Sequence, residues 1–84
     1  MAWSDIVITV TGTNGDTVTL SASNPTGQSE TARASVTVSL DSGGTETLVS
    51  PNFTLAAGAT RTISLRASAP IGSISDGPDP TPPI

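Results

Sequence analysis

Seven carboxylates are the side chains of this sequence that come nearest to catalytic or metal-binding chemistry. Serine–histidine pairs, cysteine–histidine pairs and lysine Schiff bases are excluded, because the 84 residues contain no His, no Cys and no Lys. Most of the carboxylates adjoin turn residues, where such groups ordinarily accept hydrogen bonds from backbone N–H groups. We therefore expect no catalytic site and no enzymatic activity. The seven are Asp5, Asp16, Glu30, Asp41, Glu46, Asp76 and Asp79.

Metal binding has little support in the same residues. Zinc sites in proteins rely on Cys or His, and neither is present. Calcium could use Asp76 with Asp79, or Asn14 with Asp16, but the spaced series of oxygen ligands that a calcium loop needs is missing. We expect no metal and no cofactor.

Two aromatic residues, Trp3 and Phe53, are available to stack on a sugar. We expect both in the core or at its rim. Trp3 stands in a polar neighbourhood just before the first apolar run, so filling a groove on a neighbouring molecule is the alternative, since interface cores favour aromatic residues.

The charge balance excludes several classes of partner. Three arginines against seven carboxylates give a net charge of −4, which opposes nucleic acid binding and a basic membrane-surface helix. No segment approaches the ~20 apolar residues of a membrane span. The N-terminus has neither the positive region nor the apolar run of a signal peptide. We expect no nucleic acid partner and no membrane association. The chain either stays in the cytoplasm, leaves by lysis or with a partner, or has lost a leader.

The strongest structural signal is the alternation at 31–40. Five apolar residues alternate there with five polar ones, which in a strand makes one apolar face and one polar face. We expect a central strand of an antiparallel sheet with one side on a core. The apolar residues are Ala32, Ala34, Val36, Val38 and Leu40.

Shorter alternating runs follow the same pattern, separated by turns rich in Gly, Asn, Asp and Pro. This rhythm predicts an all-β fold, a small antiparallel immunoglobulin-like β-sandwich of about six or seven strands. The core is thin for a domain without disulfides, so we expect a homo-oligomer. The further expected strands cover 6–11, 17–23, 45–50, 52–55 and 60–68, with 45–50 at an edge because Pro51 ends it.

The composition changes near residue 70, which divides the chain into a sandwich at 1–69 and a tail at 70–84. Five of the seven prolines fall in 70–84, and 77–83 is expected to run extended without entering helix or sheet. An ordered tail of this kind usually lies against a partner. The expected partner-contact residues are Met1, Trp3, Ile71, Ile74, Pro78, Pro80, Pro82, Pro83 and Ile84.

Three segments carry a family resemblance: TVTLSASNPTG at 17–27, ASVTVSLDSGG at 34–44 and FTLAAGATRTISL at 53–65. They resemble the bacterial and archaeal immunoglobulin-like domains of the cell-adhesion-related (CARDB) type. Those domains close with the pattern L-x-x-G-x-x-x-x-I-x-L, which Leu55, Gly58, Ile63 and Leu65 match. The resemblance implies an immunoglobulin-like sandwich, and it covers residues 17–67.

A free-standing, Ser/Thr-rich domain of this kind, without a leader, also resembles the decoration and cement proteins of tailed bacteriophage virions. That likeness implies a non-enzymatic structural protein, located in the virion, that binds capsid protein or its own copies through its termini and sandwich edges. The alternative is a cell-surface or filament-associated adhesion module, extracellular or at the cell surface. A carbohydrate-binding module is a further alternative.

Overall fold

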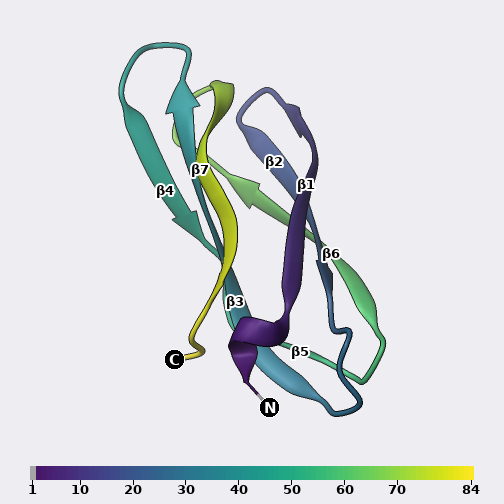
Figure 1. Ribbon diagram of the computed structural model, residues 1–84. Coiled ribbons are helices and arrows are strands. Elements are labelled where there is room, and N and C mark those ends of the chain that lie inside the picture. The colour runs from purple at the N-terminus through teal and green to yellow at the C-terminus, as the bar shows by residue number, and fades with distance from the viewer. Residues whose placement is uncertain (1) are drawn as a thin grey trace.

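Residues 2–84 are described by a computed structural model, which is built from seven antiparallel strands and one short 3-10 turn (Figure 1). The expected all-β, antiparallel architecture and its strand number are confirmed. The elements are η1 (Trp3–Asp5), β1 (Val7–Asn14), β2 (Thr17–Ser23), β3 (Glu30–Leu40), β4 (Thr45–Val49), β5 (Phe53–Leu55), β6 (Thr60–Arg66) and β7 (Ile71–Thr81).

The strands form two sheets that face each other (Figure 1). The first sheet has the order β1-β2-β6, and in the second β4, β5 and β7 all pair with β3. β4 and β7 pair with the same stretch of β3, so they lie along its opposite edges. The prediction that 31–40 is a central strand is therefore confirmed.

The core lies between the inward faces of both sheets. In β3 the residues at alternate positions from Glu30 to Val38 are buried, and in β2 the buried residues are Val18, Leu20 and Ala22. The period of two expected from the sequence thus places one face of each strand on a common core. The buried apolar residues are Ile6, Ile8, Val18, Leu20, Ala22, Ala32, Ala34, Val36, Val38, Leu48, Phe53, Leu55, Leu65 and Ala67.

β7 corrects the expectation that 77–83 stays out of the sheet. The strand continues through Thr81 and pairs with β3 despite Pro78 and Pro80. Pro80 lies opposite Ala34, whose N–H donates to Ser50 Oγ and whose C=O accepts from Ser50 N. Ala34 therefore directs both backbone groups toward β4, and it needs no donor from Pro80. Pro78 lies at a register shift, between the pairs Ser35–Asp79 and Thr37–Asp76, where the regular ladder is interrupted and a residue without an N–H is tolerated.

The turns follow the residue types predicted for them. Asn14 ends β1 and Gly15 follows at φ 62°, a conformation that glycine adopts without steric cost. A hairpin with this turn joins β1 to β2, as the Asn-Gly pair predicts. A second hairpin joins β3 to β4 through 41–44.

Candidate interaction surface

The linker between β6 and β7 is fixed at one end of the molecule by backbone hydrogen bonds. Ala67 N donates to Asp16 O at 2.7 Å, and Ile71 N donates to Gly15 O at 2.8 Å. Asp41 N donates to the carbonyl of Pro70 at 3.0 Å. The segment that crosses from the first sheet to the second is therefore held against the hairpin turns of both sheets.

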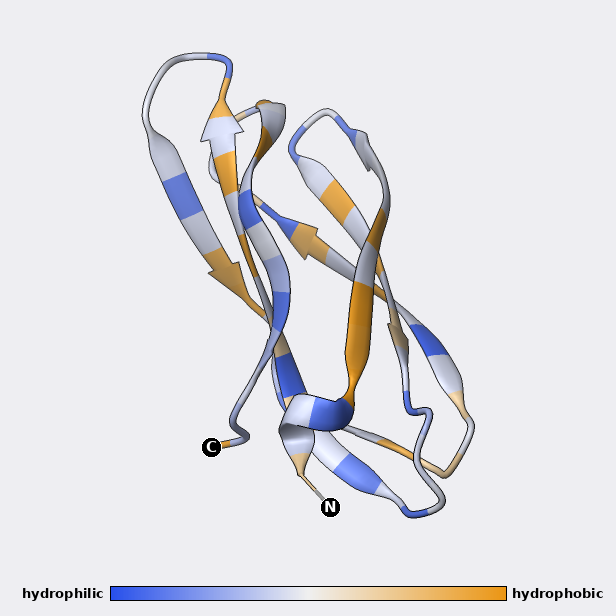
Figure 2. Cartoon of the chain, in the orientation of Figure 1, coloured by the Kyte–Doolittle hydropathy of each residue, from blue (hydrophilic) through white to orange (hydrophobic). Residues whose placement is uncertain are grey.

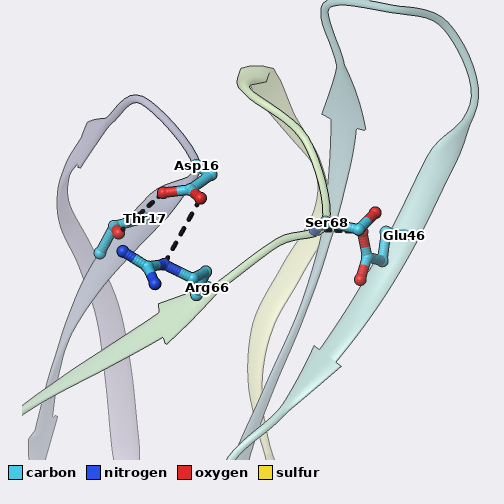
Figure 3. Close-up of polar contacts among 5 residues, drawn as sticks. All are labelled: Asp16, Thr17, Glu46, Arg66 and Ser68. Atoms are coloured by element: carbon cyan, nitrogen blue, oxygen red, sulfur yellow. Dashed lines mark hydrogen bonds and ion pairs between the residues drawn. The ribbon is translucent and has the colours of Figure 1, made fainter.

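Side-chain contacts reinforce this end (Figure 3). Arg66 Nε lies 3.4 Å from Asp16 Oδ2, in an exposed ion pair. Glu46 Oε1, on β4, accepts hydrogen bonds from Ser68 N at 3.0 Å and from Ser68 Oγ at 2.8 Å. Both hydrogen bonds stabilise the ionised carboxylate and so lower the pKa of Glu46 below its ordinary value. The bond from the Ser68 backbone N–H has the larger effect on this pKa, and the bond from the Ser68 hydroxyl has the smaller one. The charged side chains of Asp16, Arg66 and Glu46 therefore have a structural role at this end of the molecule.

At the opposite end, 82–84 is fastened to the second sheet by two side chains. Arg33 Nε donates to Pro82 O at 2.8 Å. Asn52 Nδ2 donates to Ile84 O at 3.0 Å, and Asn52 Oδ1 accepts from Ile84 N at the same distance. The backbone of Ile84 is thus held while its side chain is 94% exposed. An apolar side chain on a fixed backbone is suited to enter a partner surface, because little chain entropy is lost on binding.

The expected partner-contact residues divide into groups in the structure. Those half-buried against the chain's own core are Trp3, Ile71 and Ile74. Pro78 and Pro80 are half-buried within β7, and the exposed ones are Pro82, Pro83 and Ile84. Met1 lies outside the described residues. The exposed group is therefore confined to the last three residues of the chain.

Small hydroxyl side chains are common on the outward faces of both sheets. One row across the first sheet consists of Thr9, Ser21 and Thr62. On the second sheet, Thr31 and Thr54 share a hydrogen bond of 2.8 Å between their Oγ1 atoms. Pairs of this kind satisfy each other's hydrogen bonds across neighbouring strands.

Asn24 and Glu30 are polar residues that the structure buries. Neither residue was expected from the sequence to have a buried role. Asn24 is fully buried, and its side chain joins the loop after β2 to the chain after β5. Glu30 is 7% exposed, and within residues 2–84 its Oε2 has no hydrogen-bond partner. The burial of Glu30 follows from its place on the inward side of β3, two residues before Ala32, and this alternation was visible in the sequence.

Within residues 2–84 there is no group of three metal-ligating side chains and no pocket. No helix in that part of the chain is long and apolar enough to cross a membrane. A scan against family models found no match, and searches of curated proteins and of solved structures likewise returned none.

Proposed function

We propose that the chain is a non-enzymatic structural protein that decorates or cements a virion capsid. In this proposal the two sheets form an immunoglobulin-like sandwich, which binds capsid subunits or its own copies through its termini and strand edges. The observation that carries it is the fixed display of Ile84, whose backbone is tied to Asn52 while its side chain stands in solvent. A preorganised exposed group loses little conformational entropy on binding, which favours a lasting contact.

The hydroxyl-covered faces and the fixed linker support the same proposal. With the linker fixed and the faces rich in hydroxyl groups, the ends of the domain and its strand edges are the parts available for contacts. Small domains commonly bind other proteins through strand edges. A cell-surface or filament-associated adhesion module would use the same edges, and it is the alternative. A carbohydrate-binding module has less support, because Trp3 packs against the core and does not stand clear as a stacking platform.

The direct test is the composition of particles released from cells whose genome encodes the chain. We expect the chain in the virion band of a density gradient, at a fixed ratio to the capsid protein. Its absence from that band, with the chain recovered in the cell-surface fraction, would favour the adhesion module.

A variant can then test the contact residue. Because β7 is part of the second sheet, deletion of 70–84 would damage the fold and would be uninformative. Ile84→Ser instead removes the exposed apolar group alone, and we expect it to weaken particle binding without lowering the thermal midpoint. Val49→Ser is a matched control, since Val49 is also an exposed apolar residue, at 45%. Equal binding by Ile84→Ser and the unmodified chain would contradict the contact.

A further inference from the structure

The three asparagines of the chain differ in how firmly the fold holds their side chains. An asparagine amide carbon is an electrophile, and the backbone nitrogen of the next residue is a nucleophile tethered close to it. Their reaction closes a succinimide ring, and it is one reason why asparagine is a thermolabile residue. The reaction needs a side chain that is free to turn and a following N–H that is free to attack.

Asn24 and Asn52 do not meet these conditions. Asn24 is buried, its amide donates to three carbonyls, and the nitrogen of Pro25 carries no proton to lose. Asn52 has both amide atoms bonded to the backbone of Ile84, at 3.0 Å each. The next residue, Phe53, is buried. The fold therefore holds both side chains away from the nitrogen that follows them.

Asn14, by contrast, meets both conditions. Asn14 and Gly15 are exposed, at the tip of the β1–β2 hairpin, where hydrophilic residues follow the apolar part of β1 (Figure 2). Within residues 2–84 the Asn14 amide makes no hydrogen bond, and the N–H of Gly15 has no backbone acceptor. The space around Gly15 is open, because an added Cβ would meet no atom within 4 Å.

We propose that Asn14 is a site of spontaneous deamidation, at which the backbone nitrogen of Gly15 attacks Cγ of Asn14. Glycine at this place removes the side chain that would otherwise crowd the attacking nitrogen. It also lets the backbone rotate as the ring closes, since glycine moves between positive and negative φ at little steric cost. Its φ in the folded turn is 62°.

The reaction balances without any oxidant or reductant. The Gly15 nitrogen loses its proton to solvent and forms a bond to Cγ of Asn14, while the bond from Cγ to Nδ2 breaks and ammonia leaves with a proton from solvent. Water then opens the succinimide. Attack of water at Cγ gives aspartate, and attack at the backbone carbonyl carbon gives isoaspartate. One water is consumed for each ammonia released.

The two products differ in their effect on the linker between β6 and β7. Aspartate leaves the backbone as it was and adds one negative charge near Asp16 and Arg66, which already form an ion pair. Isoaspartate instead lengthens the main chain by one carbon just before Gly15. The carbonyls of Gly15 and Asp16 accept from Ile71 N at 2.8 Å and from Ala67 N at 2.7 Å. The isoaspartate product displaces these acceptors and so loosens the linker.

The test of the site is to keep the purified, folded chain at mildly alkaline pH, which favours loss of the N–H proton, and to locate products by peptide mass spectrometry. We expect Asn14 to convert at least about tenfold faster than Asn24 or Asn52, because only Asn14 can bring the reacting atoms together. Asn14→Gln is the control, since its longer side chain must close a larger ring, and it should stay intact. Conversion of Asn14 only after unfolding in urea, or conversion no faster than that of Asn52, would overturn the inference.

Hydrogen exchange tests the effect of the products on the linker. In the isoaspartate fraction we expect the amides of Ala67 and Ile71 to exchange about tenfold faster than in the unmodified chain. Asn14→Asp is the matched control, because it adds the charge without lengthening the backbone, and it should keep both amides protected. Unchanged exchange in the isoaspartate fraction would overturn the loosening alone. The inference does not depend on the proposed function, and particle binding is measured separately.

Discussion

Replacing Asn24 with Ala should destabilise the fold more than any other polar-to-alanine substitution discussed here. Its Nδ2 donates to the carbonyls of Gln28, Leu55 and Ala56, at 2.7, 3.0 and 3.2 Å. Its Oδ1 accepts from Thr26 N at 3.0 Å and from Thr26 Oγ1 at 2.7 Å. One buried side chain thus ties the loop after β2 to the chain after β5.

The magnitude follows from counting these bonds. Two N–H groups serve three acceptors, so about four full hydrogen bonds are lost, at about 1 kcal/mol each. Gln28 and Ala56 are exposed, so their carbonyls recover water, whereas the bond to Leu55 O is buried. We therefore expect a loss of about 2–3 kcal/mol, which lowers the thermal midpoint of a domain this size by about 10–20 °C.

Urea unfolding, followed by far-ultraviolet circular dichroism and by the fluorescence of Trp3, measures this loss. Coincident transitions would justify a two-state free energy. Asn52→Ala is the matched control, because the same side chain is exposed there and makes two hydrogen bonds. We expect about 0.5 kcal/mol for the control. A loss at Asn24 below about 0.5 kcal/mol, or no larger than at Asn52, would refute the assignment of Asn24 as a structural tie.

Three further substitutions test other parts of the fold. Gly77→Ala should cost about 2 kcal/mol, because φ is 86° and a Cβ would lie 3.2 Å from Ser35 O; Gly15→Ala, at φ 62° in open space, should cost about 1 kcal/mol by the same urea assay. Leu20→Ala should cost about 3 kcal/mol, because Leu20 is fully buried, and a loss below about 1 kcal/mol would contradict its core position. Glu46→Gln tests the lowered pKa of Glu46. The ionised form stabilises the fold above the ordinary pKa of 4.5, and this contribution is lost as the pH falls through the lowered value. The difference in urea midpoint between the parent and Glu46→Gln should therefore be present at neutral pH and vanish in acid; a difference independent of pH would contradict it.

Alternation predicted the strands well because it reflects a local geometric constraint. Val36 and Val38 are buried as expected, since a strand with one face on a core needs a period of two. The short run from Phe53 to Leu55 was also predictable, because both apolar residues share one face. Pairing between strands distant in sequence, such as β2 with β6, depends on the whole set of strands, and no local pattern specifies it.

The polar ties were less accessible to sequence reasoning. Asn24 begins an Asn-Pro turn, and the same residue type serves exposed turns and buried connections alike. Its role depends on Leu55 and Ala56, which lie more than thirty residues away. The contacts of Arg33 and Asn52 with the end of the chain also join residues that are distant in the sequence. Their partners are backbone atoms of Pro82 and Ile84, and backbone atoms leave no signature in a sequence.

The proline-rich strand, by contrast, did carry a readable signal. Pro78 and Pro80 are two residues apart, so in an extended chain both nitrogens lie on the same side, and Asp79 between them presents its N–H to the other. A segment with this spacing can pair on one side only. It therefore predicts an edge strand, whereas prolines at adjacent positions would remove donors from both sides.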